Sequence, residues 1–225
     1  MKQLQYKCIV LDHDDTTVNT TPLIHYQSYI NFMNKYKPNS PQITLQQWYV
    51  EMWDKNLFQF LSDYMKLNET EMKQISEEWM KLHKTIPIQM FEGFYELMTE
   101  YKQLGGIVCI CSHSQQKVIQ QFYDSYRDGI LQPDCIFGLE KNEIEKCKPY
   151  TYPIEEIMRK YQLEKKDIVV IDDLYHGLEM ARRSGVDAIG TLYGIGHELV
   201  EKLIKEMTSI VVHSIDELRS LLIIN

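Results

Sequence analysis

The chain has 225 residues and a formal net charge of −8, from 24 basic and 32 acidic side chains. This length suits one domain, or one domain with a sizeable insertion, and a hydrophobic content of 44% excludes a disordered or fibrous chain. The acidic balance argues against partners such as nucleic acid or an anionic membrane surface, because both are bound through Lys and Arg.

Short apolar segments predict strands that are buried on both faces of a sheet. The clearest are rich in β-branched side chains, show no polar alternation, and cover residues 8–11, 107–111 and 168–171. Weaker strands are predicted over residues 134–137, 188–192 and 210–212.

Between these strands the apolar residues recur at helical spacing. Helices are predicted over residues 94–104, 115–123, 154–161 and 175–184, and after Ser214. Ser114 is the expected N-cap of the second of these helices. Strands that alternate with helices predict an α/β fold, a doubly wound Rossmann-like parallel sheet with helices on both faces.

One region interrupts the alternation of strands and helices. From about Thr21 to Ile88 there is no strand-like segment, and amphipathic stretches run over residues 48–61 and 69–82. We therefore predict an all-helical domain over residues 19–88, inserted into a core formed by residues 1–18 and 89–225. Its many aromatic residues could line a binding surface or form an ordinary helix-bundle core.

The cysteines and the N-terminus indicate a reduced environment. The chain has five cysteines and no CxxC pair, so a redox dithiol or a zinc ribbon has no support. Cys109 and Cys111 lie within an apolar strand and are expected to be buried core residues. The first residues lack the long apolar segment of a signal peptide, and we expect a cytoplasmic protein.

Polar and acidic residues follow the predicted strands at the points where the strands end. Asp12 and Asp14 follow the first strand, Ser112 the second, and Asp172-Asp173 the third. Ligands of open α/β sheets bind beyond the carboxyl ends of the strands. A carboxylate repels a phosphate dianion unless a cation lies between them, and Mg²⁺ prefers oxygen ligands.

Two further groups could contact the phosphoryl oxygens of a substrate. The hydroxyl of Ser112 can donate a hydrogen bond, and the ammonium of Lys148 can act as a point charge against the developing transition state. The pattern of acids, hydroxyl and amine thus predicts a magnesium-dependent phosphoryl-transfer site.

In this order the four segments resemble the motifs of the haloacid dehalogenase superfamily, in its phosphoglycolate-phosphatase-like branch with a helical cap. The matching residues are Asp12, Asp14 and Thr16 for the first motif, Ser112 for the second, Lys148-Pro149 for the third and Asp172-Asp173 for the fourth. The inserted helical segment then corresponds to the cap domain of that family.

The resemblance implies a role for each residue. Asp12 would attack phosphorus and form an aspartyl-phosphate, and Asp14 would act as general acid and base. Ser112, Lys148 and the backbone N–H of His113 would hold the phosphoryl group. The residues implied as ligands of Mg²⁺ are Asp12, the backbone carbonyl of Asp14, Asp173 and, directly or through a neighbour, Asp172.

Asp14 also selects the reaction within the superfamily. Dehalogenases lack an acid two residues after the nucleophile, whereas phosphatases keep it because an alkoxide leaving group needs a proton. The resemblance therefore implies a phosphatase acting on a small phosphorylated metabolite, as a monomer or a homodimer. Tyr49, Trp53 and Lys55 are the cap residues expected to contribute to substrate choice.

Several positions depart from the family pattern. Asp15 and Asp172 stand where Gly is usual, and Thr17 replaces an aliphatic residue. Gly177 stands where a second acid is frequent, and His113 where Asn is frequent. Asp15 could add a third carboxylate near the metal or point outward.

Three other functions share parts of this pattern. A signalling receiver domain also uses acids, a hydroxyl and a Lys-Pro, but it is about half this length and has no cap. A sugar phosphomutase would share every core residue and differ in its cap. A phosphate-binding relative without catalysis is the third alternative.

Overall fold

A parallel sheet forms the centre of the molecule. The computed structural model describes residues 2–126, 132–140 and 143–224. Within this part of the chain the sheet has six strands, in the order β4 (Cys135–Phe137), β3 (Ile107–Cys111), β2 (Cys8–Leu11), β5 (Ile168–Asp172), β6 (Asp187–Thr191) and β7 (Val211–Val212). All neighbouring strands are parallel. Each predicted strand is thus present, and β4, β5, β6 and β7 differ from the expected bounds by one residue.

The central strands are covered on both faces, as their unbroken apolar sequence predicts. Ile9 and Leu11 of β2 point into one buried cluster, which includes side chains of α5 (Phe94–Gln103), α6 (Gln116–Asp124) and α10 (Ile215–Leu222). Cys8 and Val10 point into a second cluster with α7 (Tyr152–Tyr161) and α8 (Tyr175–Ser184). This alternation confirms the doubly wound α/β class.

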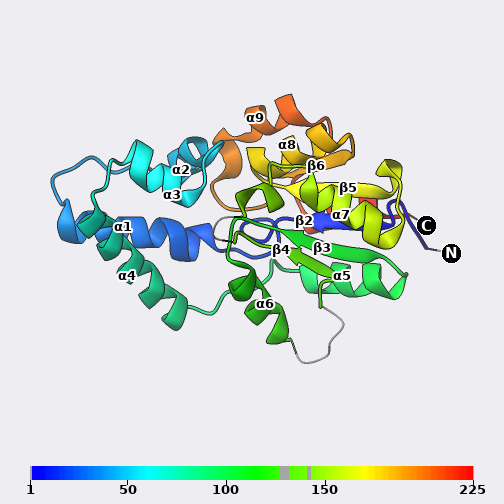
Figure 1. Ribbon diagram of the computed structural model, residues 1–225. Coiled ribbons are helices and arrows are strands. Elements are labelled where there is room, and N and C mark those ends of the chain that lie inside the picture. The colour runs from blue at the N-terminus through cyan, green and yellow to red at the C-terminus, as the bar shows by residue number, and fades with distance from the viewer. Residues whose placement is uncertain (1, 127–131, 141–142, 225) are drawn as a thin grey trace.

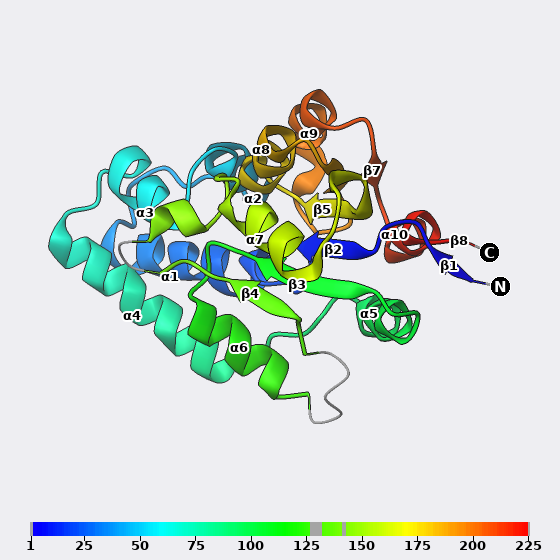
Figure 2. The ribbon, with the colours of Figure 1, turned by 45° about the vertical axis from the view of Figure 1, so that its right-hand side comes forward.

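The views of the ribbon agree with these two layers. Figure 1 shows α8 and α9 (Glu201–Met207) above the sheet and α5 and α6 below it, and Figure 2 shows the same arrangement after rotation. Both termini lie at the end of the molecule away from helices α1–α4. There β1 (Gln3–Leu4) pairs with β8 (Ile223–Ile224) in a short antiparallel ribbon.

The segment between β2 and β3 is helical. It contains η1 (Thr21–His25), α1 (Tyr26–Tyr36), α2 (Leu45–Met52), α3 (Leu57–Gln59), η2 (Phe60–Tyr64) and α4 (Glu69–Thr85). Among the described residues 19–88 no strand is assigned. The division of the chain into two domains at these boundaries stays a prediction; the name "cap" is used below for residues 19–88.

Most of the aromatic residues of the cap form its own core. Trp48 packs on Phe60, with 4.5 Å between ring centroids, and both are buried together with Phe32. The amphipathic stretch over residues 48–61 is divided among α2, α3 and η2. Asn56 caps the backbone N–H of Gln59 and starts a new helix, so α2 and α3 are separate.

Outside the cap, the described residues also form short 3₁₀ helices, namely η3 (Ile144–Lys146), η4 (Lys165–Asp167) and η5 (His197–Leu199). No helix among the described residues combines the length and the apolar character needed to cross a lipid bilayer.

Candidate active site

The chain places its first acidic motif at the switch point of the sheet. Strand β2 lies between β3 and β5, which follow it in sequence on opposite sides. The chain leaves β2 toward β3 on one side and leaves β5 toward β6 on the other, and this opens a crevice at the carboxyl end of β2. Asp12 occupies this end, where its backbone N–H donates to the carbonyl of Ile171 at 2.9 Å.

Lys148 joins the first acidic motif to the fourth. Its Nζ lies 2.8 Å from Asp12 Oδ1 and 2.6 Å from Asp172 Oδ2, and all three side chains are buried. Burial would lower the pKa of Lys148, but the charges of Asp12 and Asp172 outweigh it and raise this pKa well above its usual value. A permanent positive charge therefore lies beside the Asp12 carboxylate.

Three carboxylates form a cluster at this point that suits a hard divalent cation. Asp12, Asp172 and Asp173 each have an oxygen within 4.8 Å of the others. Burial, together with the neighbouring acids, raises the pKa of Asp12 well above its usual range, although Lys148 opposes this. Burial likewise raises the pKa of Asp172 to about 6.

One ammonium for three buried carboxylates leaves the cluster short of positive charge. An all-oxygen donor set with excess negative charge is what Mg²⁺ requires, so the residues present fit this ion. Asp173 is held in place from two sides. It accepts a hydrogen bond from Thr16 Oγ1 at 3.0 Å, and its Oδ2 lies 2.8 Å from His197 Nε2.

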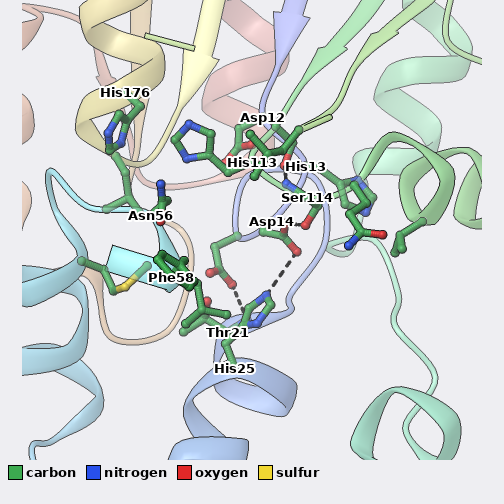
Figure 3. Close-up of a pocket in the computed structure, with 18 of the residues that line it drawn as sticks. Asp12, His13, Asp14, Thr21, His25, Asn56, Phe58, His113, Ser114 and His176 are labelled. Atoms are coloured by element: carbon green, nitrogen blue, oxygen red, sulfur yellow. Dashed lines mark hydrogen bonds and ion pairs between the residues drawn. The ribbon is translucent and has the colours of Figure 1, made fainter. Parts of the chain in front are cut away.

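Asp14 lies outside this cluster and is held by three neighbours. Thr20 Oγ1 donates to its Oδ1 at 2.6 Å, and Ser114 Oγ donates to its Oδ2 at 2.6 Å. His25 Nε2 lies 3.6 Å from Oδ1 (Figure 3). Burial would raise the pKa of Asp14, but His25 and Ser114 contribute to holding it well below its usual range.

The prediction for Ser114 is wrong. It does not cap the following helix, since α6 begins after Gln115 and its N-cap has no side-chain hydrogen bond. The Ser114 hydroxyl turns instead toward Asp14, which offers a stronger, ionised acceptor.

Of the two positions considered from the sequence, the structure excludes the outward one, because Asp15 is buried, and burial together with the nearby charge of Asp173 raises its pKa to about 6. Its φ is +60°, a conformation that suits the Gly usual at this site and that Asp tolerates better than most residues. Its side chain is buried, and Oδ1 accepts from the backbone N–H groups of Thr20 and Thr21 at 3.2 and 2.9 Å. Asp15 thereby fixes the start of η1, the first turn of the cap.

Residues of the second motif lie beside the acids. Ser112 lines the same pocket as Asp12, Asp14 and Lys148, and its backbone N–H donates to the Phe137 carbonyl. His113 Nε2 lies 2.8 Å from the Lys148 carbonyl oxygen. Burial, and then the charge of Lys148, lowers the pKa of His113 to about 3, so its ring is neutral.

The cap closes the pocket over these groups. A cavity of about 280 Å³ lies between them, and Figure 3 shows Asn56 and Phe58 of the cap facing the core residues His113 and His176. Of the three expected cap residues, only Lys55 lines it. Tyr49 packs on His197 instead, and Trp53 on Tyr175, so the prediction for these two residues is wrong.

The sequence analysis did not identify the histidines that contact Asp14 and Asp173. His25 is fixed by Trp79, whose Nε1 donates to His25 Nδ1 at 3.1 Å, and this leaves Nε2 facing Asp14. His197, the first residue of η5, contacts Asp173 from a position 24 residues further along the chain. Neither histidine has a local motif that could have marked it, because both contacts are formed by the tertiary structure.

Comparisons with known proteins agree with this architecture. The model of a family described as haloacid dehalogenase-like hydrolase matches residues 9–191. The pyrophosphatase PpaX of Anoxybacillus flavithermus is 20% identical over 198 residues, which cover 83% of this chain and 84% of that protein.

Two solved structures share the fold at low sequence identity. A protein predicted to be a phosphoglycolate phosphatase from Haemophilus somnus has a TM-score of 0.67 and 18% identity, covering 92% of this chain and 93% of its own. A protein assigned as a beta-phosphoglucomutase from Thermotoga maritima has a TM-score of 0.69 and 14% identity, covering 96% and 98%. At such identities the likeness concerns the fold alone.

Proposed function

Because the chain belongs to the family of haloacid dehalogenase-like hydrolases, we propose that it is a Mg²⁺-dependent phosphatase that cleaves a small phosphate monoester through an aspartyl-phosphate. The observation that carries this proposal is the convergence of three separate segments on one pocket, with the acids of a fourth segment close to Asp12. Asp12, Asp14, Ser112 and Lys148 all line it, and the acids of the fourth motif lie directly behind Asp12.

The first half of the reaction uses Asp12 as the nucleophile. A carboxylate oxygen of Asp12 attacks phosphorus, the P–O bond to the alcohol breaks, and an acyl phosphate forms on Asp12. Lys148 neutralises charge on the phosphoryl oxygens, and Ser112 and the His113 backbone N–H donate to them. The carboxylates of Asp12, Asp172 and Asp173 and the Asp14 carbonyl would hold Mg²⁺, which supplies electrostatic shielding between nucleophile and phosphate.

Asp14 moves the proton in both halves. It gives a proton to the departing alcohol and then accepts one from the water that attacks the aspartyl-phosphate. Its two oxygens are oriented by Thr20 and Ser114, so the carboxyl group is fixed without involving the metal cluster. Hydrolysis returns Asp12 and Asp14 to their starting states.

The names of the relatives suggest substrates and leave one rival open. Inorganic pyrophosphate and phosphoglycolate are the substrates that these names indicate for the relatives, and each carries a second anionic group. A phosphomutase would use the same core groups but return the phosphoryl group to a second hydroxyl of a sugar. Release of inorganic phosphate from a glucose phosphate, without an isomeric product, separates hydrolysis from mutase chemistry.

The test is turnover of 4-nitrophenyl phosphate with MgCl₂ and with EDTA. We expect turnover that requires Mg²⁺ and falls at least about 10³-fold in Asp12→Asn, since this change removes the nucleophile and keeps the shape of the side chain. Asp124→Asn, an exposed acid at the end of α6, is the matched control and should retain wild-type turnover. Folded wild-type protein without metal-dependent turnover on a broad phosphometabolite panel would favour the non-catalytic phosphate-binding alternative.

A further inference from the structure

We infer that the substrate is a phosphate monoester whose leaving alcohol is uncharged and has a flat apolar face, an inference that rests on the proposed function. The observations are the side chains that surround the cavity beyond Asp12 and Asp14. These side chains are mainly apolar, whereas the floor of the cavity, formed by Asp12, Asp14, Ser112 and Lys148, is polar.

The outer walls of the cavity are mainly apolar. Both the cap and the core contribute, through Met52, Phe58, Trp79, Val118, Leu139 and Leu174. Phe58 is 67% exposed, although it is a large aromatic side chain. It faces the cavity from α3 (Figure 3), so part of its ring is free to contact a bound molecule. Aromatic and aliphatic walls favour a flat apolar group.

Within the described residues, two lysines line the cavity, and each already contacts a carboxylate of this chain. Lys148 lies between Asp12 and Asp172 on the floor, where the phosphoryl group would be bound. Lys55 Nζ lies 2.9 Å from Asp54 Oδ1 and donates to the Glu51 carbonyl at 3.1 Å. No arginine of the described chain lines this cavity.

The histidines of the walls do not supply the missing charge. His113 and His176 pack edge to face with 4.7 Å between centroids, and burial lowers their pKa values to about 3 and about 4. His83 is likewise shifted down by burial, so its pKa lies below the usual value. His25 already faces Asp14 and accepts from Trp79.

An anionic group on the alcohol would therefore be desolvated without a free cationic partner. An unpaired buried charge is strongly disfavoured, whereas an apolar face gains from contact with the walls. The volume of about 280 Å³ suits a small ester.

The test compares benzyl phosphate, 4-carboxybenzyl phosphate and ethyl phosphate under Mg²⁺. The two benzyl esters have alcohols of nearly equal acidity, so they differ mainly in charge, and ethyl phosphate lacks the ring. We expect kcat/KM for benzyl phosphate to exceed that of each other ester by at least about tenfold.

The outcomes separate this inference from the proposed function. Equal or faster turnover of the carboxylated ester, or of the ethyl ester, would overturn the inference alone. Turnover of none of the three esters and none of 4-nitrophenyl phosphate would overturn the proposed function and this inference with it.

Matched variants locate the effect in the cavity. Phe58→Ala should lower the ratio of kcat/KM for benzyl over ethyl phosphate several-fold, whereas Tyr64→Ala, an exposed cap aromatic that does not line the cavity, should not change it. Gln115→Lys adds a cation at a lining position and should raise kcat/KM for the carboxylated ester several-fold. Gln116→Lys, one residue further and outside the lining, is its control. Unchanged ratios in both Phe58→Ala and Gln115→Lys would contradict the inference.

Discussion

Asp14 has to meet opposite demands during the proposed reaction. Its neighbours His25 and Ser114 favour the ionised carboxylate, which suits the base that activates water. To protonate the departing alkoxide, Asp14 must instead be a protonated carboxylic acid. A substrate whose leaving group needs no proton tests the base role of Asp14 without its acid role.

We expect Asp14→Asn to show a burst with 4-nitrophenyl phosphate. Nitrophenolate leaves without a proton, so about one equivalent is released rapidly, while steady turnover falls about 10²- to 10⁴-fold because the base is missing. Rapid-mixing absorbance at the nitrophenolate band measures both phases. Benzyl phosphate, whose alkoxide needs the proton, should give no burst in the same variant. Equal loss in both phases would contradict separate acid and base roles.

At the scale of elements, the turn between β5 and α8 shows how the fourth motif departs from its family. An ideal Cβ at Gly177 would lie 1.9 Å from Asp172 Oδ2 and 2.5 Å from its Cγ. The Asp172 carboxylate thus fills the space that a side chain at position 177 would need. Compared with the family pattern, this chain has the acid at the strand end, as Asp172, and the glycine in the first turn of the helix, as Gly177.

We predict that Gly177→Asp destabilises the protein by about 1–3 kcal/mol, because it overpacks this turn and displaces Asp172 from Lys148. The double change Asp172→Gly with Gly177→Asp should recover most of this loss, since the clash is gone and an acid occupies the first turn of a helix. Denaturant unfolding and Mg²⁺ titration calorimetry of the wild type, both single variants and the double variant measure the coupling. Additive effects in this cycle would show that the two positions do not share the space.

Helix α8 also carries an ion-paired carboxylate on the far side of the site. Glu179 is buried and accepts from Arg182 Nε at 2.6 Å and Arg183 Nε at 2.7 Å. The hydrogen bond from Arg182, with that from Arg183, lowers the pKa of Glu179 to about 2. A lowered folded pKa stabilises the protein above the unfolded pKa, and this contribution is lost as pH falls toward the folded value.

Glu179→Gln should therefore lower the free energy of unfolding by about 1–2 kcal/mol at pH 7, a value reduced because both arginines are exposed. The difference from wild type should shrink between about pH 4.5 and about pH 2. Urea unfolding at several pH values measures it. Glu77→Gln, an exposed position on α4, serves as the control; a difference that grows on acidification would refute the assignment.

At the scale of the whole molecule, cap and core meet on two sides of the site. Tyr49 of α2 packs on His197 with 4.1 Å between ring centroids, and His197 in turn contacts Asp173. Tyr49 also belongs to a buried cluster with Leu178, Val200 and Ile204 of the core. Through Tyr49 the cap thus packs on the core beside the acidic cluster. Other cap residues, including Asn56 and Phe58, line the pocket.

Binding of Mg²⁺ should stabilise the entire chain, because it offsets repulsion among three buried carboxylates. At about 100 times the dissociation constant the gain is about 2.7 kcal/mol, which corresponds to a rise in Tm of about 5–10 °C for a chain of this size. Differential scanning fluorimetry with MgCl₂, and reversal by EDTA, measures it. Asp173→Asn should lose most of the rise, and an equal rise in this variant would place the ion elsewhere.

Local sequence patterns were sufficient to predict the fold class and the family. Strands 8–11, 107–111 and 168–171 were predictable because they are unbroken apolar runs, and only a sheet covered on both faces buries such runs completely. The spacing of Asp12, Asp14, Ser112, Lys148 and Asp172-Asp173 then indicated the superfamily, which the match over residues 9–191 confirms.

The partner of each site side chain depends on contacts that form when the chain folds. Ser114 turns to Asp14 instead of capping α6, and Asp15 caps the first turn of the cap. His25 and His197 reach the acids from distant segments, while Lys55 lines the pocket and Tyr49 does not. A buried ionised oxygen needs a hydrogen-bond partner, and here the partners come from residues that are distant in the sequence. Local sequence patterns do not indicate which distant residues will be in contact.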